Sequence, residues 1–226
     1  MPITISGSTG IAGVDGSAAT PAVQGTDTNT GVYYPAADQV AIATNGAQRV
    51  LVDASGNMTV TGTLQANGVT GSVYPLVSGT AQASTSGVNI DFTGLPSWVK
   101  RITVMFNGVS TNGTAGFSIQ LGTSAGIVST GYSGGVGVGT TYNANSTAFF
   151  SYNSATAADL VSGAIVITSF GSNIWAAAGA VFQASNGAPR TSGGTVTLPG
   201  TLDRVRIATA NGTDTFDAGS INILYE

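Results

Sequence analysis

The run Arg101-Ile102-Thr103-Val104-Met105-Phe106-Asn107 places a large apolar side chain at every second position. Successive side chains of a strand point to opposite faces, so Ile102, Val104 and Phe106 share one face. The same period of two returns at Gly116–Leu121, Leu202–Ala208 and Ser220–Tyr225. A period of two repeated over several short runs predicts an all-β fold.

Two further runs, Ala164–Thr168 and Trp175–Gln183, are more continuously apolar, as the central strands of a sandwich can be. Asn-Gly pairs, which favour tight turns, begin at Asn107, Asn112, Asn186 and Asn211. Many short strands with frequent turn signals are typical of an antiparallel sandwich or jelly roll. We therefore predict that residues 75–226 form a β-sandwich or jelly-roll head.

The composition leaves few groups for chemistry. Charged residues make up 7% of the 226 residues, and none lies between Arg101 and Asp159. In an ordinary soluble domain roughly a quarter of the residues are charged. There is no His and no Cys, which excludes Ser-His and Cys-His catalysis and removes the preferred zinc ligands. We expect no catalytic residues, no metal and no cofactor.

Charge and hydropathy also restrict the partners. The net charge is −4, with only six Lys and Arg residues, whereas phosphate binding needs clustered cations. The longest apolar runs, such as Ile174–Phe182, are about half of what a bilayer requires. We therefore expect neither nucleic-acid binding nor membrane insertion.

Residues 36–74 contain three short β-like pieces: Val40–Thr44, Gln48–Asp53 and Met58–Leu64. Asn45-Gly46 separates the first two, which is a strong hairpin signal. In the third piece Met58, Val60 and Leu64 share one face. About 30 residues cannot bury such a face against themselves, but copies of the segment from other subunits can. We interpret this region as a short β stem.

Residues 1–35 are rich in Gly and are interrupted by Pro2, Pro21 and Pro35. A segment so poor in apolar residues is not expected to fold alone. We predict that it is an extended segment ordered by docking onto another component, as an anchor would be.

Three stretches resemble bacteriophage tail-fibre proteins. Residues 201–226, TLDRVRIATANGTDTFDAGSINILYE, resemble the C-terminal ends of these proteins, and so do residues 91–106, DFTGLPSWVKRITVMF. Residues 27–36, DTNTGVYYPA, followed by residues 44–57, TNGAQRVLVDASGN, are similar to a stem module of phage fibres and virion structural proteins. The chain is shorter than that of a long fibre.

The resemblance implies a homotrimer with an interwoven stem. Its N-terminal segment would be held by tail, baseplate or capsid proteins, and its distal head would meet a bacterial surface glycan. The chain would then be part of the phage particle, assembled in the host cytoplasm.

The best binding candidate is the segment from Ser129 to Thr147, which we expect to be a loop. It carries Tyr132 and Tyr142 among Gly, Ser, Asn and Thr, with Asn143 and Asn145 close by. Sugars are bound by aromatic faces together with amide and hydroxyl groups. An ordinary loop with its Tyr residues packed at the base is the alternative. Within the segment, Gly134–Gly139 is expected to be flexible.

Three functions remain open at this stage. The first is a tail fibre that adheres to the host, and the second is a head fibre or capsid decoration without a receptor role. The third is a polysaccharide depolymerase, which needs two carboxylates. Asp203, Asp214 and Asp217 are the possible suppliers, although Asp at turns and strand edges is the simpler interpretation.

Overall fold

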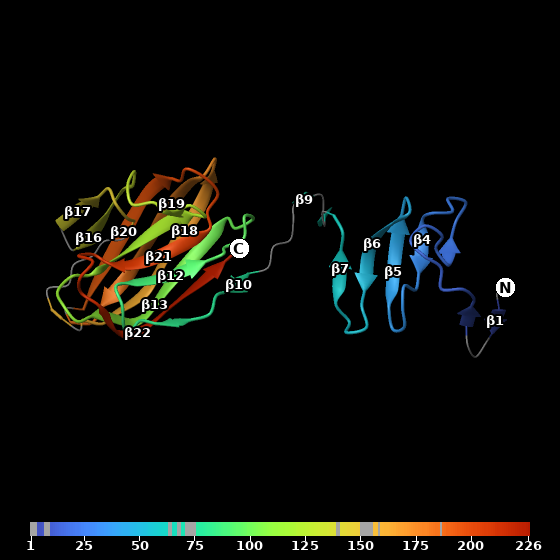
Figure 1. The fold of residues 1–226 in the computed structure, drawn as a ribbon, viewed down its shortest axis with the longest axis horizontal. Helices are drawn as coiled ribbons and strands as arrows, with labels where there is room; N and C mark the ends of the chain where they lie inside the picture. The colour runs from blue at the N-terminus through green and yellow to red at the C-terminus, as the bar shows by residue number, and fades with distance from the viewer. Residues whose placement is uncertain are drawn as a thin grey trace. The chain divides into compact units, whose positions relative to one another are not determined.

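The computed structural model describes residues 4–6, 10–62, 65–66, 69–70, 76–138, 141–149, 156–157, 159–185 and 187–226. Every regular element in these ranges is a β-strand, and every strand pair is antiparallel (Figure 1). The all-β prediction is confirmed. The chain divides into two compact units, an N-terminal unit (Met1–Val73) and a C-terminal unit (Tyr74–Glu226).

The N-terminal unit is built around a five-stranded meander. It consists of β3 (Val23–Gln24), β4 (Gly31–Tyr33), β5 (Val40–Thr44), β6 (Ala47–Val52) and β7 (Met58–Val60) in that order. Two small hairpins flank it: β1 (Thr4–Ser6) with β2 (Gly10–Ala12), and β8 (Gln65–Ala66) with β9 (Val69–Thr70).

The first two β-like pieces predicted in residues 36–74 coincide with β5 and β6, and the start of the third piece coincides with β7. Asn45 and Gly46 both have positive φ, at 53° and 70°, which is the geometry of the predicted two-residue hairpin between β5 and β6. Because β4 pairs with β5, the boundary expected between residues 35 and 36 falls inside one sheet. Leu64, predicted to share a face with Met58 and Val60, lies outside the described residues.

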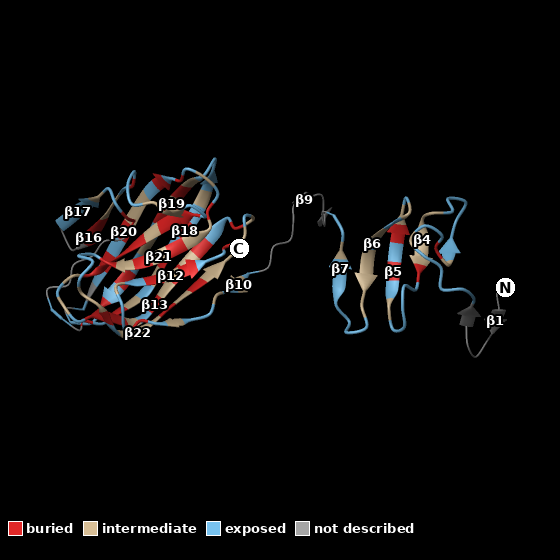
Figure 2. Cartoon of the chain, viewed as in Figure 1, coloured by how far each residue is buried: buried red, intermediate tan, exposed pale blue. Residues whose placement is uncertain are grey.

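Burial alternates along β5 (Figure 2), so the two faces of the five-stranded sheet differ. One face has a small core, formed by Tyr33, Ala41 and Ala43 with Ala18 and Leu51 packed against it. On the other face, register aligns one β-branched residue from each strand in a single row: Val23, Val32, Ile42, Val50 and Val60. A second row holds Val40, Val52 and Met58. We call these eight side chains the apolar ladder.

The C-terminal unit contains two sheets. The nine-stranded sheet has the order β10 (Val77–Ser78), β22 (Phe216–Tyr225), β13 (Arg101–Thr111), β18 (Val161–Gly171), β19 (Ile174–Gln183), β20 (Ala188–Thr197), β16 (Ser133–Val138) and β17 (Thr141–Asn145), with β11 (Gln82–Ala83) also on β22. The four-stranded sheet has the order β12 (Asn89–Thr93), β21 (Arg204–Thr209), β14 (Phe117–Thr123) and β15 (Gly126–Ile127).

Both sheets contribute to one apolar core. Ile102, Val104 and Phe106 of β13 are buried, as their alternation predicts. They belong to one cluster with side chains of the opposite sheet: Phe92, Ile119, Leu121, Val205 and Ile207. The runs predicted as strands all fall on strands of these two sheets. The core therefore follows from the period of two in the sequence.

One predicted turn is a bulge. Asn107-Gly108 lies inside β13, where the register shifts against both β18 and β22. Gly219 of β22 sits opposite, with φ +90°, and a Cβ on it would lie 2.3 Å from the Gly108 carbonyl oxygen. The strands approach here more closely than any side chain allows, so the bulge depends on glycine.

Gly219→Ala is expected to destabilise the C-terminal unit by about 3 kcal/mol or more, because the left-handed φ and the backbone clash add. Gly212→Ala is the matched control, since Gly212 has φ +68° but open space where a Cβ would stand. We expect this variant to lose about 1 kcal/mol of unfolding free energy. Urea unfolding of the two variants measures the difference. Equal losses would contradict the close approach of β13 and β22.

Candidate functional site

A groove of about 480 Å³ opens on the nine-stranded sheet over β16, β17 and β20. Its lining includes Tyr142, Thr191 and several glycines, and no lining residue is charged. Tyr142 is 80% exposed. β17 is the edge strand of the sheet, so its outer side chains are open to solvent.

Glycine makes room for the tyrosine. Gly137 pairs directly with Tyr142 across the β16–β17 hairpin. A Cβ on Gly137 would lie 3.2 Å and 3.3 Å from two ring carbons of Tyr142 and 2.9 Å from Thr191 Oγ1. The ring therefore lies across the position where a side chain of β16 would stand, with the Thr191 hydroxyl close to it.

The floor of the groove is backbone. Gly135 of β16 pairs with Gly193 of β20, so neither strand raises a side chain at that position. Thr191 supplies a hydroxyl within the groove, and the next pair on the same face, Ser133 with Thr195, carries two more beyond its lining. An exposed ring beside hydroxyl groups and bare peptide is suited to the flat apolar face of a sugar and its hydroxyls.

Tyr132 does not contribute to this groove, contrary to our expectation. Its side chain is 4% exposed and meets Phe149 edge-on, with ring centroids 5.0 Å apart. Its hydroxyl accepts a hydrogen bond from the Leu121 N–H at 2.8 Å and donates one to the Val128 carbonyl at 3.0 Å. Tyr132 is a core residue that ties its segment to β14.

The two asparagines also separate from Tyr142. Asn143 is exposed but pairs with Val136, a buried residue of the inner face, so its side chain lies on the opposite face of the sheet from Tyr142. Asn145 Oδ1 accepts hydrogen bonds from Thr147 N at 2.7 Å, Thr147 Oγ1 at 2.9 Å and Ala148 N at 3.1 Å. Of the four predicted residues, Tyr142 and Asn143 line the groove, and of these two only Tyr142 has its side chain on the face of the sheet that carries Gly137 and Thr191.

The segment is not the loop that we expected. Gly134–Val138 belongs to β16, which pairs with β17 on one side and β20 on the other. Its glycines pair with Gly194, Gly193 and Thr191 of β20, which lie 54 to 60 positions further along the chain, and that pairing orders them. Thr191 and Gly193 were missed for the same reason, since nothing in the local sequence indicates a long-range strand partner.

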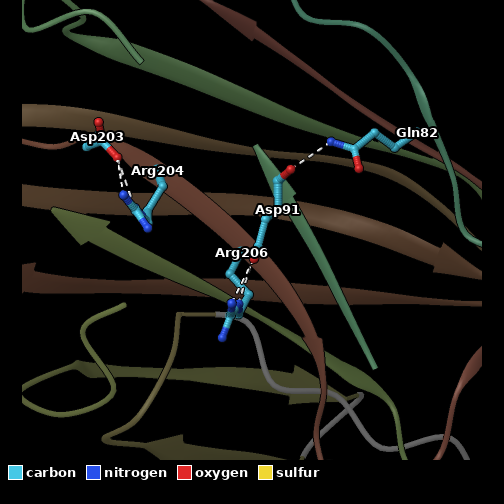
Figure 3. A network of polar contacts seen from close by, with 5 residues as sticks. All are labelled: Gln82, Asp91, Asp203, Arg204 and Arg206. Carbon is cyan, nitrogen blue, oxygen red and sulfur yellow. Dashed lines mark hydrogen bonds and ion pairs between the residues drawn. The ribbon is translucent and has the colours of Figure 1, made fainter. Parts of the chain in front are cut away.

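The three candidate carboxylates have structural roles. Asp203 pairs with Arg204 at 2.7 Å (Figure 3), and Asp217 accepts a hydrogen bond from the Ser110 hydroxyl. Hydrogen bonds involving Asn211 and the Ala115 N–H lower the pKa of Asp214. A lowered pKa keeps this carboxyl ionised, which is unsuited to the protonated acid of glycoside hydrolysis.

A buried polar network was not anticipated. Arg190 donates to Gln183 Oε1, with Nε at 2.7 Å, and Gln183 donates in turn to Asp159. The three side chains are 6%, 1% and 6% exposed. Asp159 ends the long uncharged run of the sequence and also accepts the Ser185 N–H at 3.0 Å. The network connects two buried charges through an amide and ties β19 to β20.

Within the described part of the chain, no three acidic side chains gather where they could hold a metal ion. No helix of these residues has the length and hydropathy to cross a membrane. Comparisons of the chain with protein-family models, with curated proteins and with solved structures give no match.

Burial raises the pKa of Tyr132 to about 12, from 10 in an exposed tyrosine. The Tyr132 hydroxyl therefore ionises at lower pH in the unfolded chain than in the folded chain. Its contribution to the free energy of unfolding is complete below pH 10 and is lost between pH 10 and 12. Two pKa units correspond to about 3 kcal/mol.

We expect the wild type to lose more unfolding free energy over this pH range than Tyr132→Phe, which itself costs about 1–3 kcal/mol at neutral pH through the unpaired Leu121 N–H. Urea unfolding at several pH values measures both effects. Parallel pH profiles of the two proteins would show that Tyr132 ionises freely in the folded state.

Proposed function

We propose that this chain is the subunit of a homotrimeric bacteriophage fibre, held to the virion by its N-terminal segment and adhering to a bacterial surface glycan through the C-terminal unit. The observation that carries the proposal is the apolar ladder, an uncovered row of β-branched side chains across a whole sheet. The resemblance of residues 27–57, 91–106 and 201–226 to phage fibres supplies the context.

The apolar ladder needs a partner. Ile42 is 44% exposed, Val23 57% and Met58 66%, although all three belong to strands of a regular sheet. The small core of the unit lies on the opposite face, so among the described residues the ladder remains partly exposed. Contiguous exposed apolar surface of this kind marks an interaction site. Three copies turned face inward bury one another's ladders, which is the arrangement that an interwoven stem uses.

Adhesion is assigned to the Tyr142 groove. An open, uncharged groove holds a neutral sugar weakly, and weak single sites are sufficient when three are carried on one fibre and several fibres on one particle. Since no charged side chain lines the groove, binding is not screened by salt. The nearest alternative, a head fibre without a receptor role, shares the trimer and lacks the adhesion.

Light scattering of the full-length chain is expected to give three times 22.3 kDa. Ile42→Asp is expected to give monomers at the same concentration, because burying an unpaired carboxylate costs several kcal/mol per subunit. Thr59→Asp adds the same charge to an exposed position on the other face of the sheet and is expected to remain trimeric. A monomeric wild type contradicts the fibre.

Tyr142→Ala is expected to weaken binding of the fluorescently labelled full-length chain to bacterial cells and to arrayed bacterial polysaccharides by tenfold or more, since truncating a central aromatic costs about 2 kcal/mol. Tyr142→Phe keeps the ring and is expected to retain most binding. Phe170→Ala, which removes another exposed aromatic of the same unit, controls for general stickiness.

Binding is expected to change little between about 0.1 M and about 1 M salt. Unchanged binding by Tyr142→Ala would contradict the groove as the adhesion site. A trimer that binds neither cells nor polysaccharides would favour the head fibre or capsid decoration.

A further inference from the structure

The outer face of the nine-stranded sheet has no charged side chain in two rows across its central strands, and the Arg101–Glu226 ion pair lies at one end of this area. One cross-strand row reads Leu224, Thr103, Val166, Ala178 and Gly193, from β22 to β20. The next reads Asn222, Met105, Ala164, Ala180 and Thr191. Over β18 and β19 no side chain of these rows is larger than Val. Over these two rows the surface is therefore flat as well as uncharged, and Phe182 stands in the row beyond them.

The outer face of the four-stranded sheet has the opposite character. Arg206 of β21 forms two hydrogen bonds of 2.7 Å with the carboxylate of Asp91 on β12 (Figure 3). Arg204 stands on the same face of β21 and pairs with Asp203. A chain with six basic and ten acidic residues thus places an ion pair at the middle of one sheet and none at the middle of the other. An outer face meant for water normally carries polar and charged side chains.

We infer that the flat face over β13, β18 and β19 packs against other copies of this chain in the assembled fibre, so that the C-terminal units contact one another as the stems do. This inference rests on the proposed trimer. It adds a second contact surface, distinct from the apolar ladder, and it leaves the Tyr142 groove on β16 and β17 at the margin of the contact, open to solvent.

The size of the face indicates which partner covers it. Outward residues recur about every 6.6 Å along a strand and strands lie about 4.8 Å apart, so the outward residues of β13, β18 and β19 in these rows, with Thr168 and Ala176, cover about 250 Å². A free-standing complex buries about 800 Å² on each partner. A contact of this size is too small to hold separate subunits together, so it requires that the copies are joined elsewhere. Joining through the N-terminal units meets this requirement, because tethering raises the effective concentration to about the millimolar range.

Cysteine accessibility tests the inference in the full-length chain, which contains no cysteine of its own. Ala178→Cys places a thiol at the centre of the flat face, and Ala208→Cys places one on the outer face of the four-stranded sheet. Within a single chain Ala178 is exposed and Ala208 is half-buried, so an isolated subunit reacts faster at position 178. In the assembled protein we expect the opposite order. The thiol at position 178 should react with a maleimide at least tenfold more slowly than the thiol at position 208.

The same cysteine variants made together with Ile42→Asp separate the proposed trimer from the proposed contact between C-terminal units. Ile42→Asp is expected to break the contact between apolar ladders and so to separate the subunits. Ala178→Cys should then regain fast labelling while Ala208→Cys remains unchanged. Fast labelling at position 178 in a protein that light scattering shows to be trimeric overturns the head contact and leaves the fibre standing. A wild type that is monomeric overturns the proposed function and this inference together.

Discussion

The C-terminal unit depends on the pairing of β13 with β18 on one side and β22 on the other. This register brings Ile102, Val104 and Phe106 onto the same face as the buried isoleucines of both neighbours, and the four-stranded sheet covers that face. Few ion pairs are available, so apolar burial and backbone ladders supply most of the stability. The bulge at Gly108 belongs to the same contact, because Gly219 lies so close to the Gly108 carbonyl oxygen that a Cβ on Gly219 would clash with it.

A period of two gives every strand two faces, and the inner core uses only one of them. In the N-terminal unit the second face is the apolar ladder, and in the C-terminal unit it is the flat surface over β13, β18 and β19. The apolar ladder holds no charged side chain and the flat surface has one ion pair, Arg101–Glu226, at its end, whereas the four-stranded sheet carries the Asp91–Arg206 pair outward near its middle. The distribution of a small number of charges therefore separates faces that meet water from faces that we assign to other subunits. Tyr142 stands at the margin between them, where a groove can form without a charged side chain beside it.

Much of the fold could be predicted because it depends on local alternation. The strands around Val104, Ile119, Ile207 and Ile223 follow from apolar residues at every second position, and the Asn45-Gly46 hairpin follows from its turn residues. The candidate site was predicted less well. Tyr132 and Tyr142 look alike in sequence, in a segment rich in Gly and Ser, yet one packs on Phe149 and the other is exposed. Their difference depends on strand pairings that span tens of residues.

The sequence by itself determined the all-β class, the lack of a catalytic His or Cys, the alternation that forms the core and the apolar face of the stem segment. These are properties of composition and of neighbouring residues. Only the tertiary structure decided that Asn107-Gly108 is a bulge, that β16 is a strand with Thr191 beside it, and that Asp159, Gln183 and Arg190 meet in the interior. Each of these depends on which distant strand lies alongside, and register between distant strands is set by how all the faces pack at once.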